Sequence, residues 1–354
     1  MLPALLVSRS SIAENSSRVC SLCRSAGVEV FGVTKGVCGD PRIASAMLEG
    51  GCSGLADSRL ENIARMREAG LKGPFMLLRI PSPSRIGEVA RLADVVLVSE
   101  GEVLRALDEA CASEGRRVQA LLMVDVGDLR EGIWPDEVRS IGRVLRGLRW
   151  VRPIGVATNV GCFGGVLPDS RNMGLLLEVK EALEEVLGEG LPVASGSGTV
   201  GLRLVEEGTM PAGINQLRIG EAILLGRDTT GDRVIGYLRQ DTMRLQAEVI
   251  EVKRKPSVPI GEVGLDAFGR KPAFVDRGVR RRALLALGKQ DVHPSSLTPL
   301  EEGVEVLGAS SDHTVLDVEG YRGRLEVGQV LSFSLDYPGM LSCFTSPYVE
   351  KRVV

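Results

Sequence analysis

The feature that most constrains the fold is a regular alternation between residues 28 and 225, where short apolar runs are separated by amphipathic stretches. This alternation is typical of repeated βα units around a parallel sheet. The apolar runs predict eight strands, at 28–35, 53–58, 75–80, 94–99, 119–126, 152–158, 191–195 and 215–220. Eight parallel strands that alternate with helices favour a TIM-type (β/α)8 barrel, whose active site lies at the C-terminal ends of the strands.

The stretches between these runs carry helix signals. Residues 40–51 begin with an Asp cap and a Pro at the first helical position, and residues 58–70 end on a glycine. Residues 100–115 and 170–190 are similar. A helical stretch therefore follows at least four of the eight predicted strands.

The pattern changes after about residue 240, where valines, short alternations and turn residues predict strands, for example at 242–258 and 313–337. We expect a barrel domain at 10–238 and a smaller C-terminal all-β domain at 239–354. Residues 1–9 are a candidate ninth strand that joins the C-terminal domain. A chain of 354 residues is long enough for two such cores.

Composition argues against several classes of partner. The net charge of −3 and the sequence pI near 5.7 give no overall positive field for nucleic acid or an anionic membrane. The basic clusters at 253–255 and 280–282 are short, and we interpret them as solvated surface.

No apolar run approaches the roughly 20 residues of a membrane span, and the N-terminus does not resemble a secretory signal, so a cytoplasmic protein is expected. Seven cysteines, an odd number in a long chain, indicate reduced thiols. Cys20 and Cys23 match a CxxC pattern, but they lie in a helical pattern with no second pair and no histidine nearby, so no metal site is expected.

A lysine ends the first predicted strand. Lys35 follows an apolar run and precedes a glycine-rich turn, so it lies at the strand end where barrel enzymes place their active sites. Burying an ammonium without a partner is costly and lowers its pKa. Lys35 is therefore either a paired structural charge or a nucleophilic amine.

The last two predicted strands end near groups that suit a phosphate. Gly196, Gly198 and Gly201 follow the seventh strand, in the region where this kind of barrel binds phosphate. Their spacing also satisfies GxGxxG, but that motif indicates a dinucleotide only in the first βα turn. We expect backbone N–H groups to contact a phosphate here, and the hydroxyl donors would be Ser195, Ser197 and Thr199.

These elements together suggest a cofactor. A lysine nucleophile that faces a phosphate loop in the same barrel suggests a Schiff base to a phosphorylated aldehyde, and pyridoxal 5'-phosphate is the natural candidate. Arg218 ends the eighth strand. It is either a structural ion pair or a contact to the pyridine nitrogen, which it would keep largely unprotonated. The second role favours brief deprotonation at Cα over transamination or decarboxylation.

With these residues in view, the chain resembles the fold-type III pyridoxal phosphate enzymes, the alanine racemase superfamily, and in particular its ornithine racemase and broad-specificity racemase branch. Residues 30–40 are similar to the strand that carries the cofactor lysine, and 217–226 to the family's arginine-plus-glycine segment. Residues 266–292, 308–318 and 333–349 look like the β-domain of the ornithine-type racemases.

The resemblance implies roles for further residues. In residues 124–133, Arg130 would lie near the phenolic oxygen of the cofactor and the substrate carboxylate. Arg218 would meet the pyridine nitrogen, and the backbone of Gly220 and Glu221 would meet the phosphate. Asn159 stands where alanine racemase has a histidine beside the pyridine ring, and it either makes a similar contact or caps the loop.

One departure concerns the second base. Racemisation needs proton removal on one face of the carbanion and delivery on the other. In alanine racemase the residue after the glycine of the segment aligned with 283–291 is a tyrosine from the partner subunit, and here it is Lys289. Lys289 is the first candidate, with Asp312 and His313 as rivals, and surface or turn roles remain alternatives for them. Tyr337 is similar to a tyrosine that reaches the phosphate.

The expected function is therefore racemisation of a free amino acid, ornithine or another basic one, in a head-to-tail homodimer with shared active sites. Carboxylates would be expected near the distal substrate amine, and the candidates are Asp128, Asp291, Asp312 and Asp336. The alternative is a pyridoxal phosphate carrier without substantial turnover, although such carriers lack a β-domain. An aldolase or decarboxylase of the same fold is disfavoured, because only two histidines are present and because Arg218 replaces the glutamate of the decarboxylases.

Overall fold

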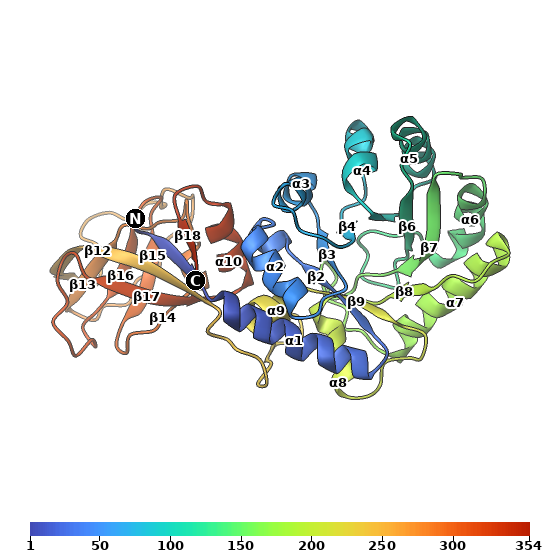
Figure 1. The fold of residues 1–354 in the computed structure, drawn as a ribbon. Coiled ribbons are helices and arrows are strands. Elements are labelled where there is room, and N and C mark those ends of the chain that lie inside the picture. Colours follow the sequence, from blue (N-terminus) through green and yellow to red (C-terminus); the bar gives the residue numbers. More distant parts are fainter. The chain divides into compact units, whose positions relative to one another are not determined.

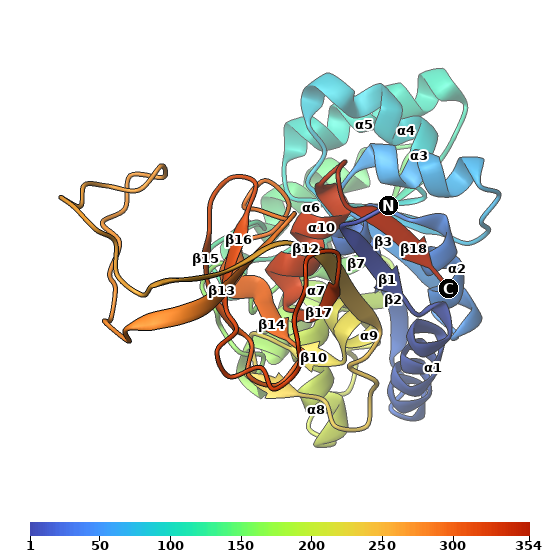
Figure 2. The same cartoon turned by 90° about the vertical axis from the view of Figure 1, so that its left-hand side faces the viewer.

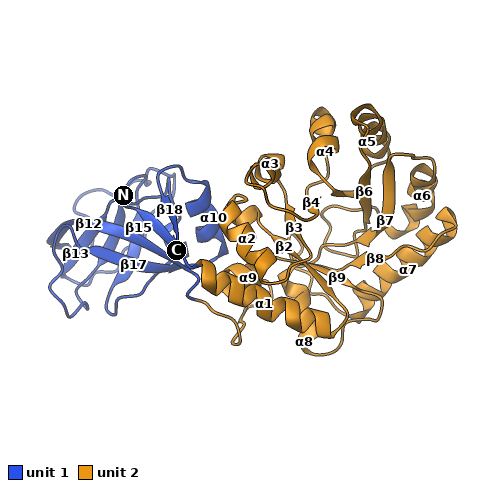
Figure 3. Cartoon of the chain, viewed as in Figure 1, with its two compact units in different colours: residues 1–8, 241–354 blue, residues 9–240 orange.

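The computed structural model describes residues 1–354 and divides them into two compact units (Figure 3). One unit is Arg9–Gln240, and the other joins Met1–Ser8 to Asp241–Val354. In Arg9–Gln240, eight parallel strands form a closed barrel in the order β2 to β9, which confirms the predicted fold class. The barrel strands are β2 (Glu29–Val33), β3 (Gly54–Asp57), β4 (Phe75–Leu77), β5 (Val95–Val98), β6 (Val118–Met123), β7 (Val151–Ala157), β8 (Val193–Ser195) and β9 (Gln216–Ile219).

Helices surround these strands (Figure 1). The helix signals hold locally: Asp40 caps α2 by accepting from Arg42 N, with Pro41 at the first position, and α5 ends on Gly115 at φ +62°. None of the helices is long and apolar enough to span a membrane. The helices of this unit are α1 (Arg9–Ser25), α2 (Pro41–Glu49), α3 (Leu60–Glu68), α4 (Ile86–Leu92), α5 (Gly101–Glu114), α6 (Val138–Arg146), α7 (Ser170–Leu187), α8 (Leu202–Glu206) and α9 (Glu221–Leu225), and short 3-10 turns include η1 (Lys35–Val37) and η4 (Thr199–Gly201).

Apolar side chains fill the interior of the barrel, so it is a packed core and its chemistry must lie at the rim. Parallel pairing sets the register that closes the barrel: Phe31 of β2 pairs with Arg218 of β9. Because paired residues of neighbouring strands point to the same face, Arg218 enters the barrel above this core. The core residues are Phe31, Val33, Ala56, Met76, Val95, Leu97, Leu121, Met123, Ile154 and Ala157.

The second unit is a β-domain that includes both ends of the chain. β1 (Ala4–Val7) pairs antiparallel with β12 (Met243–Pro256) and parallel with β18 (Glu350–Val353). The main sheet runs in the order β14-β17-β12-β13-β16-β15. Its other elements are β13 (Val279–Leu285), β14 (Leu297–Pro299), β15 (Glu305–Ala309), β16 (Thr314–Asp317), β17 (Val330–Leu335) and α10 (Tyr337–Thr345). A long loop between β12 and β13 extends away from this sheet (orange in Figure 2).

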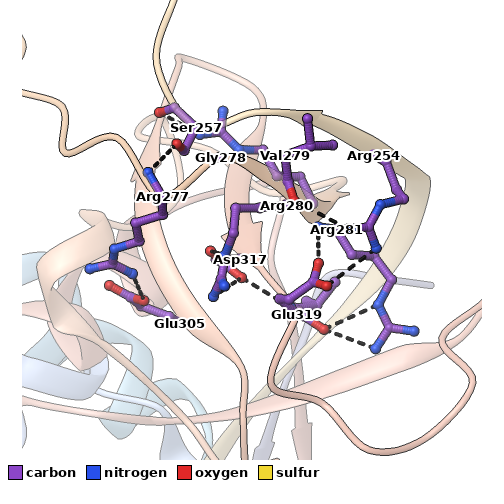
Figure 4. Close-up of polar contacts among 12 residues, drawn as sticks. Arg254, Ser257, Arg277, Gly278, Val279, Arg280, Arg281, Glu305, Asp317 and Glu319 are labelled. Atoms are coloured by element: carbon purple, nitrogen blue, oxygen red, sulfur yellow. Dashed lines mark hydrogen bonds and ion pairs between the residues drawn. The ribbon is translucent and has the colours of Figure 1, made fainter.

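The arginine cluster at 280–282 differs from the solvated surface that we predicted. Figure 4 shows the Arg280 side chain beside Asp317. Arg280 Nε lies 2.8 Å from Asp317 Oδ2, and Arg281 Nη2 donates to the Val318 carbonyl at 2.9 Å. All three arginines are half-buried. The prediction was wrong because β13 lies inside the sheet, between β12 and β16, where carboxylates and carbonyls of the neighbouring strand accept from the guanidinium groups.

Candidate active site

Lys35 stands at the C-terminal rim of the barrel. It begins η1, one residue beyond the end of β2, and its side chain is half-buried. Burial lowers the pKa of Lys35, and the nearby positive charge of Arg130 acts in the same direction, while Cys162, Asp57 and Glu131 oppose the shift. A larger fraction of this amine is therefore neutral near pH 8 than in an exposed lysine.

A buried carboxylate lies beside Lys35. Asp57 ends β3 and is fully buried; its Oδ2 accepts from Thr34 Oγ1 at 2.7 Å and its Oδ1 accepts from Asn62 Nδ2 at 2.9 Å. Burial raises the pKa of Asp57, although these hydrogen bonds lower it. In its ionised form Asp57 raises the pKa of Lys35 and so partly offsets the effect of burial on that ammonium.

This arrangement predicts the effect of Asp57→Asn. An amide keeps an acceptor for Asn62 and offers an N–H to Thr34, so the fold should persist. Because the Asp57 charge raises the pKa of Lys35, its loss should lower that pKa and speed acylation of Lys35 about three- to tenfold at pH 8. Mass spectrometry after brief acetylation measures this rate, with the exposed Lys72 as the internal reference. An unchanged ratio of Lys35 to Lys72 labelling would show that the two charges are not coupled.

Arg218 is a buried cation without an ion pair. Its side chain is held by Ser195 Oγ and by the Thr158 carbonyl, with a longer contact of 3.4 Å to the Ser195 carbonyl. All of these acceptors are neutral. Burial lowers the pKa of Arg218 to about 10, and Arg130 acts in the same direction while Glu131 opposes it. Since buried charges are normally paired, this guanidinium is available to a ligand at the rim.

The glycine-rich segment after β8 lies against β9. A Cβ at Gly198 would come 3.2 Å from the Arg218 carbonyl, and a Cβ at Gly220 would come 3.1 Å from Val33 Cβ. Thr199 Oγ1 accepts from Ala222 N at 3.2 Å, which joins η4 to α9. The first N–H groups of such turns have no acceptor inside the helix. The two segments therefore form a narrow backbone cradle at the rim.

The predicted hydroxyl groups of this segment already contact the protein. Ser195 accepts from Arg218, and Ser197 Oγ donates to the Val160 carbonyl at 2.8 Å. Thr199 accepts at its oxygen, which leaves its proton for another acceptor. Glu221 begins α9, and Thr229 donates to its carboxylate from both N–H and Oγ1. Asn159 follows β7, is half-buried and makes no side-chain hydrogen bond within the protein.

Arg130 lies on a tightly held loop after β6. Asp125 accepts from three backbone N–H groups of this loop, among them Gly127 N at 2.8 Å and Arg130 N at 3.0 Å. Gly132 has φ +133°, and a Cβ there would come 2.4 Å from Asp125 N, so only glycine fits. The Arg130 guanidinium pairs with Glu131, and its Nη1 lies 2.9 Å from Cys162 Sγ.

Asp128 joins this loop to the next one. It is 1 % exposed, and it accepts from Phe163 N at 2.9 Å and from Val166 N at 3.2 Å. Although burial alone would raise it, the pKa of Asp128 is lowered by these backbone N–H groups. Asp128, a candidate for binding a distal amine, therefore holds the loop that carries Cys162 against Arg130.

The remaining predicted residues belong to the β-domain. Lys289 Nζ lies 3.6 Å from the ring centroid of Phe268, and its backbone N–H donates to the Ser310 carbonyl at 2.9 Å. That bond places Lys289 beside the turn of Asp312 and His313, both exposed. Gln290 Nε2 donates to Asp312 Oδ1 at 2.6 Å. The structure thus gathers these three candidates at one end of the sheet.

Three other predicted residues of the β-domain have local contacts. Tyr337 begins α10, and Asp336 caps that helix by accepting from Gly339 N at 2.8 Å. Asp291 accepts from Ser346 Oγ at 2.8 Å. The two aspartates therefore have structural partners inside their own unit.

Sequence reasoning missed three residues near Lys35. Asp57 is the penultimate residue of the strand predicted at 53–58, and the C-terminal ends of barrel strands are where active-site residues are expected. Glu131 follows Arg130 directly and lies on the loop already considered. Cys162 carried no local signal, because only the hydrogen bonds of Asp128 bring its loop to Arg130.

Comparisons with known proteins agree with this geometry. The model of the alanine racemase N-terminal domain matches residues 7–228. The chain is 47% identical to a lysine racemase from Thermotoga maritima, over 99% of this chain and 98% of that protein. It is 36% identical to an ornithine racemase from Acetoanaerobium sticklandii, over the whole of both chains. The fold matches an alanine racemase from E. faecalis with a TM-score of 0.74 at 18% identity, over 99% and 98% of the two chains. The chain therefore belongs to the alanine racemase family and is an isomerase of the racemase type.

Proposed function

We propose that this protein racemises a free basic amino acid with pyridoxal 5'-phosphate as its cofactor. The observation that carries the proposal is the presence of two unusual cations at the C-terminal ends of the neighbouring strands β2 and β9. Lys35 is an amine of lowered pKa, and Arg218 is a buried guanidinium that only neutral oxygens contact. The named relatives act on lysine and ornithine, which supports a basic substrate.

The residues at the rim suit this cofactor. Pyridoxal phosphate, when bound, supplies an aldehyde that condenses with amines and a ring that accepts the electron pair of an adjacent C–H bond. Lys35 would hold the aldehyde and Arg218 the pyridine nitrogen. The backbone at Gly198, Gly220 and Glu221, with the Thr199 hydroxyl, would hold the phosphate. Asn159 has a free amide for the ring or its substituents.

Proton transfer then needs groups on two sides of the substrate. The neutral Nζ of Lys35 can take the Cα proton on one side and return it, and its lowered pKa favours the neutral form. For the other side we propose Lys289, with Asp312 and His313 as alternatives, contributed by the partner subunit of a head-to-tail homodimer. The gathering of these three residues at one end of the β-domain supports this assignment.

The test is incubation of the purified protein with pyridoxal phosphate and a panel of L-amino acids in deuterated water. We expect L-lysine and L-ornithine to acquire one solvent deuterium at Cα and to lose their optical activity, at least about tenfold faster than L-alanine. Mass spectrometry follows the label and chiral chromatography follows the enantiomers. Cofactor binding without exchange on any amino acid would favour the carrier, and faster turnover of L-alanine would refute the basic substrate.

A further inference from the structure

The guanidinium of Arg130 is held on two sides by groups of its own unit. Its Nε and Nη2 contact the two carboxylate oxygens of Glu131, and its Nη1 donates to Cys162 Sγ at 2.9 Å. A guanidinium has five N–H bonds, so these contacts leave one N–H on each terminal nitrogen. A carboxylate can accept one hydrogen bond from each of these two N–H groups, which makes a bidentate contact.

The loops around this guanidinium are held by hydrogen bonds within the protein. Asp125 holds the backbone of Arg130, and Asp128 holds the loop of Cys162. The Glu131 side chain is 23% exposed, less than the 35% of Arg130. Glu131 is therefore the more buried partner of the pair, and Arg130 stays accessible to a ligand.

The charge of Glu131 also reaches the other cations of the rim. It raises the pKa of Arg218 and of Lys35, whereas Arg130 lowers both. Glu131 and Asp57 are the carboxylates that act on Lys35, and Asp57 is engaged with Thr34 and Asn62. Without Glu131, Arg130 would still act on both Lys35 and Arg218, and Asp57 would be the one carboxylate left that acts on Lys35.

We infer that Glu131 is a positioning residue: it orients Arg130 so that the two free N–H groups bind the α-carboxylate of the substrate, and it balances the charge of Arg130 beside Lys35. The inference rests on the proposed function, because it assumes an amino acid substrate. It assigns Glu131 no contact with the reacting atoms.

The test compares Glu131→Gln with the wild-type holoenzyme. The glutamine amide has one acceptor oxygen where the carboxylate has two, so the Arg130 guanidinium loses one of its two contacts and its fixed orientation. We expect the KM for L-lysine or L-ornithine to rise about tenfold, with kcat within about threefold, and inhibition by acetate, a carboxylate without an amine, to weaken by the same factor. In the cofactor-free protein, acetylation of Lys35 relative to Lys72 at pH 8 should become several-fold faster, because a negative charge has been removed.

Two variants make the result specific. Glu131→Asp keeps the charge on a shorter side chain, so it should restore the acetylation rate of Lys35 but only part of the KM. Glu178→Gln makes the same chemical change on the exposed face of α7 and should alter neither quantity. Unchanged KM and acetate inhibition in Glu131→Gln, in an active wild type, would overturn the inference alone. A wild type that racemises no amino acid would instead refute the proposed function.

Discussion

Replacing Lys35 by alanine is expected to reduce racemisation at least about 1,000-fold, because one side chain provides both the anchoring amine and a proton-transfer group. Lys35→Arg should be nearly as inactive, since a guanidinium is always protonated and cannot accept the Cα proton. Chiral chromatography of L-lysine or L-ornithine incubations measures the loss.

A matched control separates this effect from folding. Lys35 is half-buried, so its removal costs little packing, and thermal unfolding of the cofactor-free variants should stay close to that of the wild type. Lys72→Ala removes an exposed lysine and should keep full activity. If Lys35→Ala retained more than about a tenth of the wild-type rate, Lys35 would be a structural charge and the proposed mechanism would fail.

Replacing Arg218 by methionine is expected to lower kcat/KM at least about 100-fold with little change in stability. Burial lowers the pKa of Arg218 from 12.5 to about 10, which corresponds to a cost of about 3 kcal/mol for holding the charge. Its hydrogen bonds to Ser195 and Thr158 contribute about 1.5–3 kcal/mol each, which offsets that cost. The two contributions oppose each other, so removing both should lower the free energy of unfolding by only about 1–2 kcal/mol.

Calorimetry and steady-state kinetics test the two halves of this prediction. We expect the Tm of the cofactor-free Arg218→Met variant to lie within about 5 °C of the wild type. Arg218→Lys keeps a cation but lacks the planar fork that reaches Ser195 and Thr158 together, so it should recover only part of the activity. A large fall in Tm with activity retained would show that Arg218 holds the barrel together and has no role at the rim.

The sequence alone determined the barrel and the positions of two cations at its rim, Lys35 and Arg218. Eight strands were predictable because parallel strands buried on both faces read as continuous apolar runs, and each predicted run overlaps one of the strands β2 to β9. Lys35 and Arg218 were recognisable because a charge at the end of a buried apolar run is costly unless it is paired or contacts a ligand. Their proximity followed from the closure of the barrel.

Only the tertiary structure decided which polar groups are available at the rim. Ser195, Ser197 and Asp128 looked like ligand contacts, yet each is already hydrogen-bonded to a distant part of the chain. Asp57 and Glu131 gain importance only because folding brings their charges to Lys35. Apolar periodicity is a local property that the sequence records, whereas hydrogen-bond partners and charge separations depend on residues far apart in the chain, and folding alone brings them together.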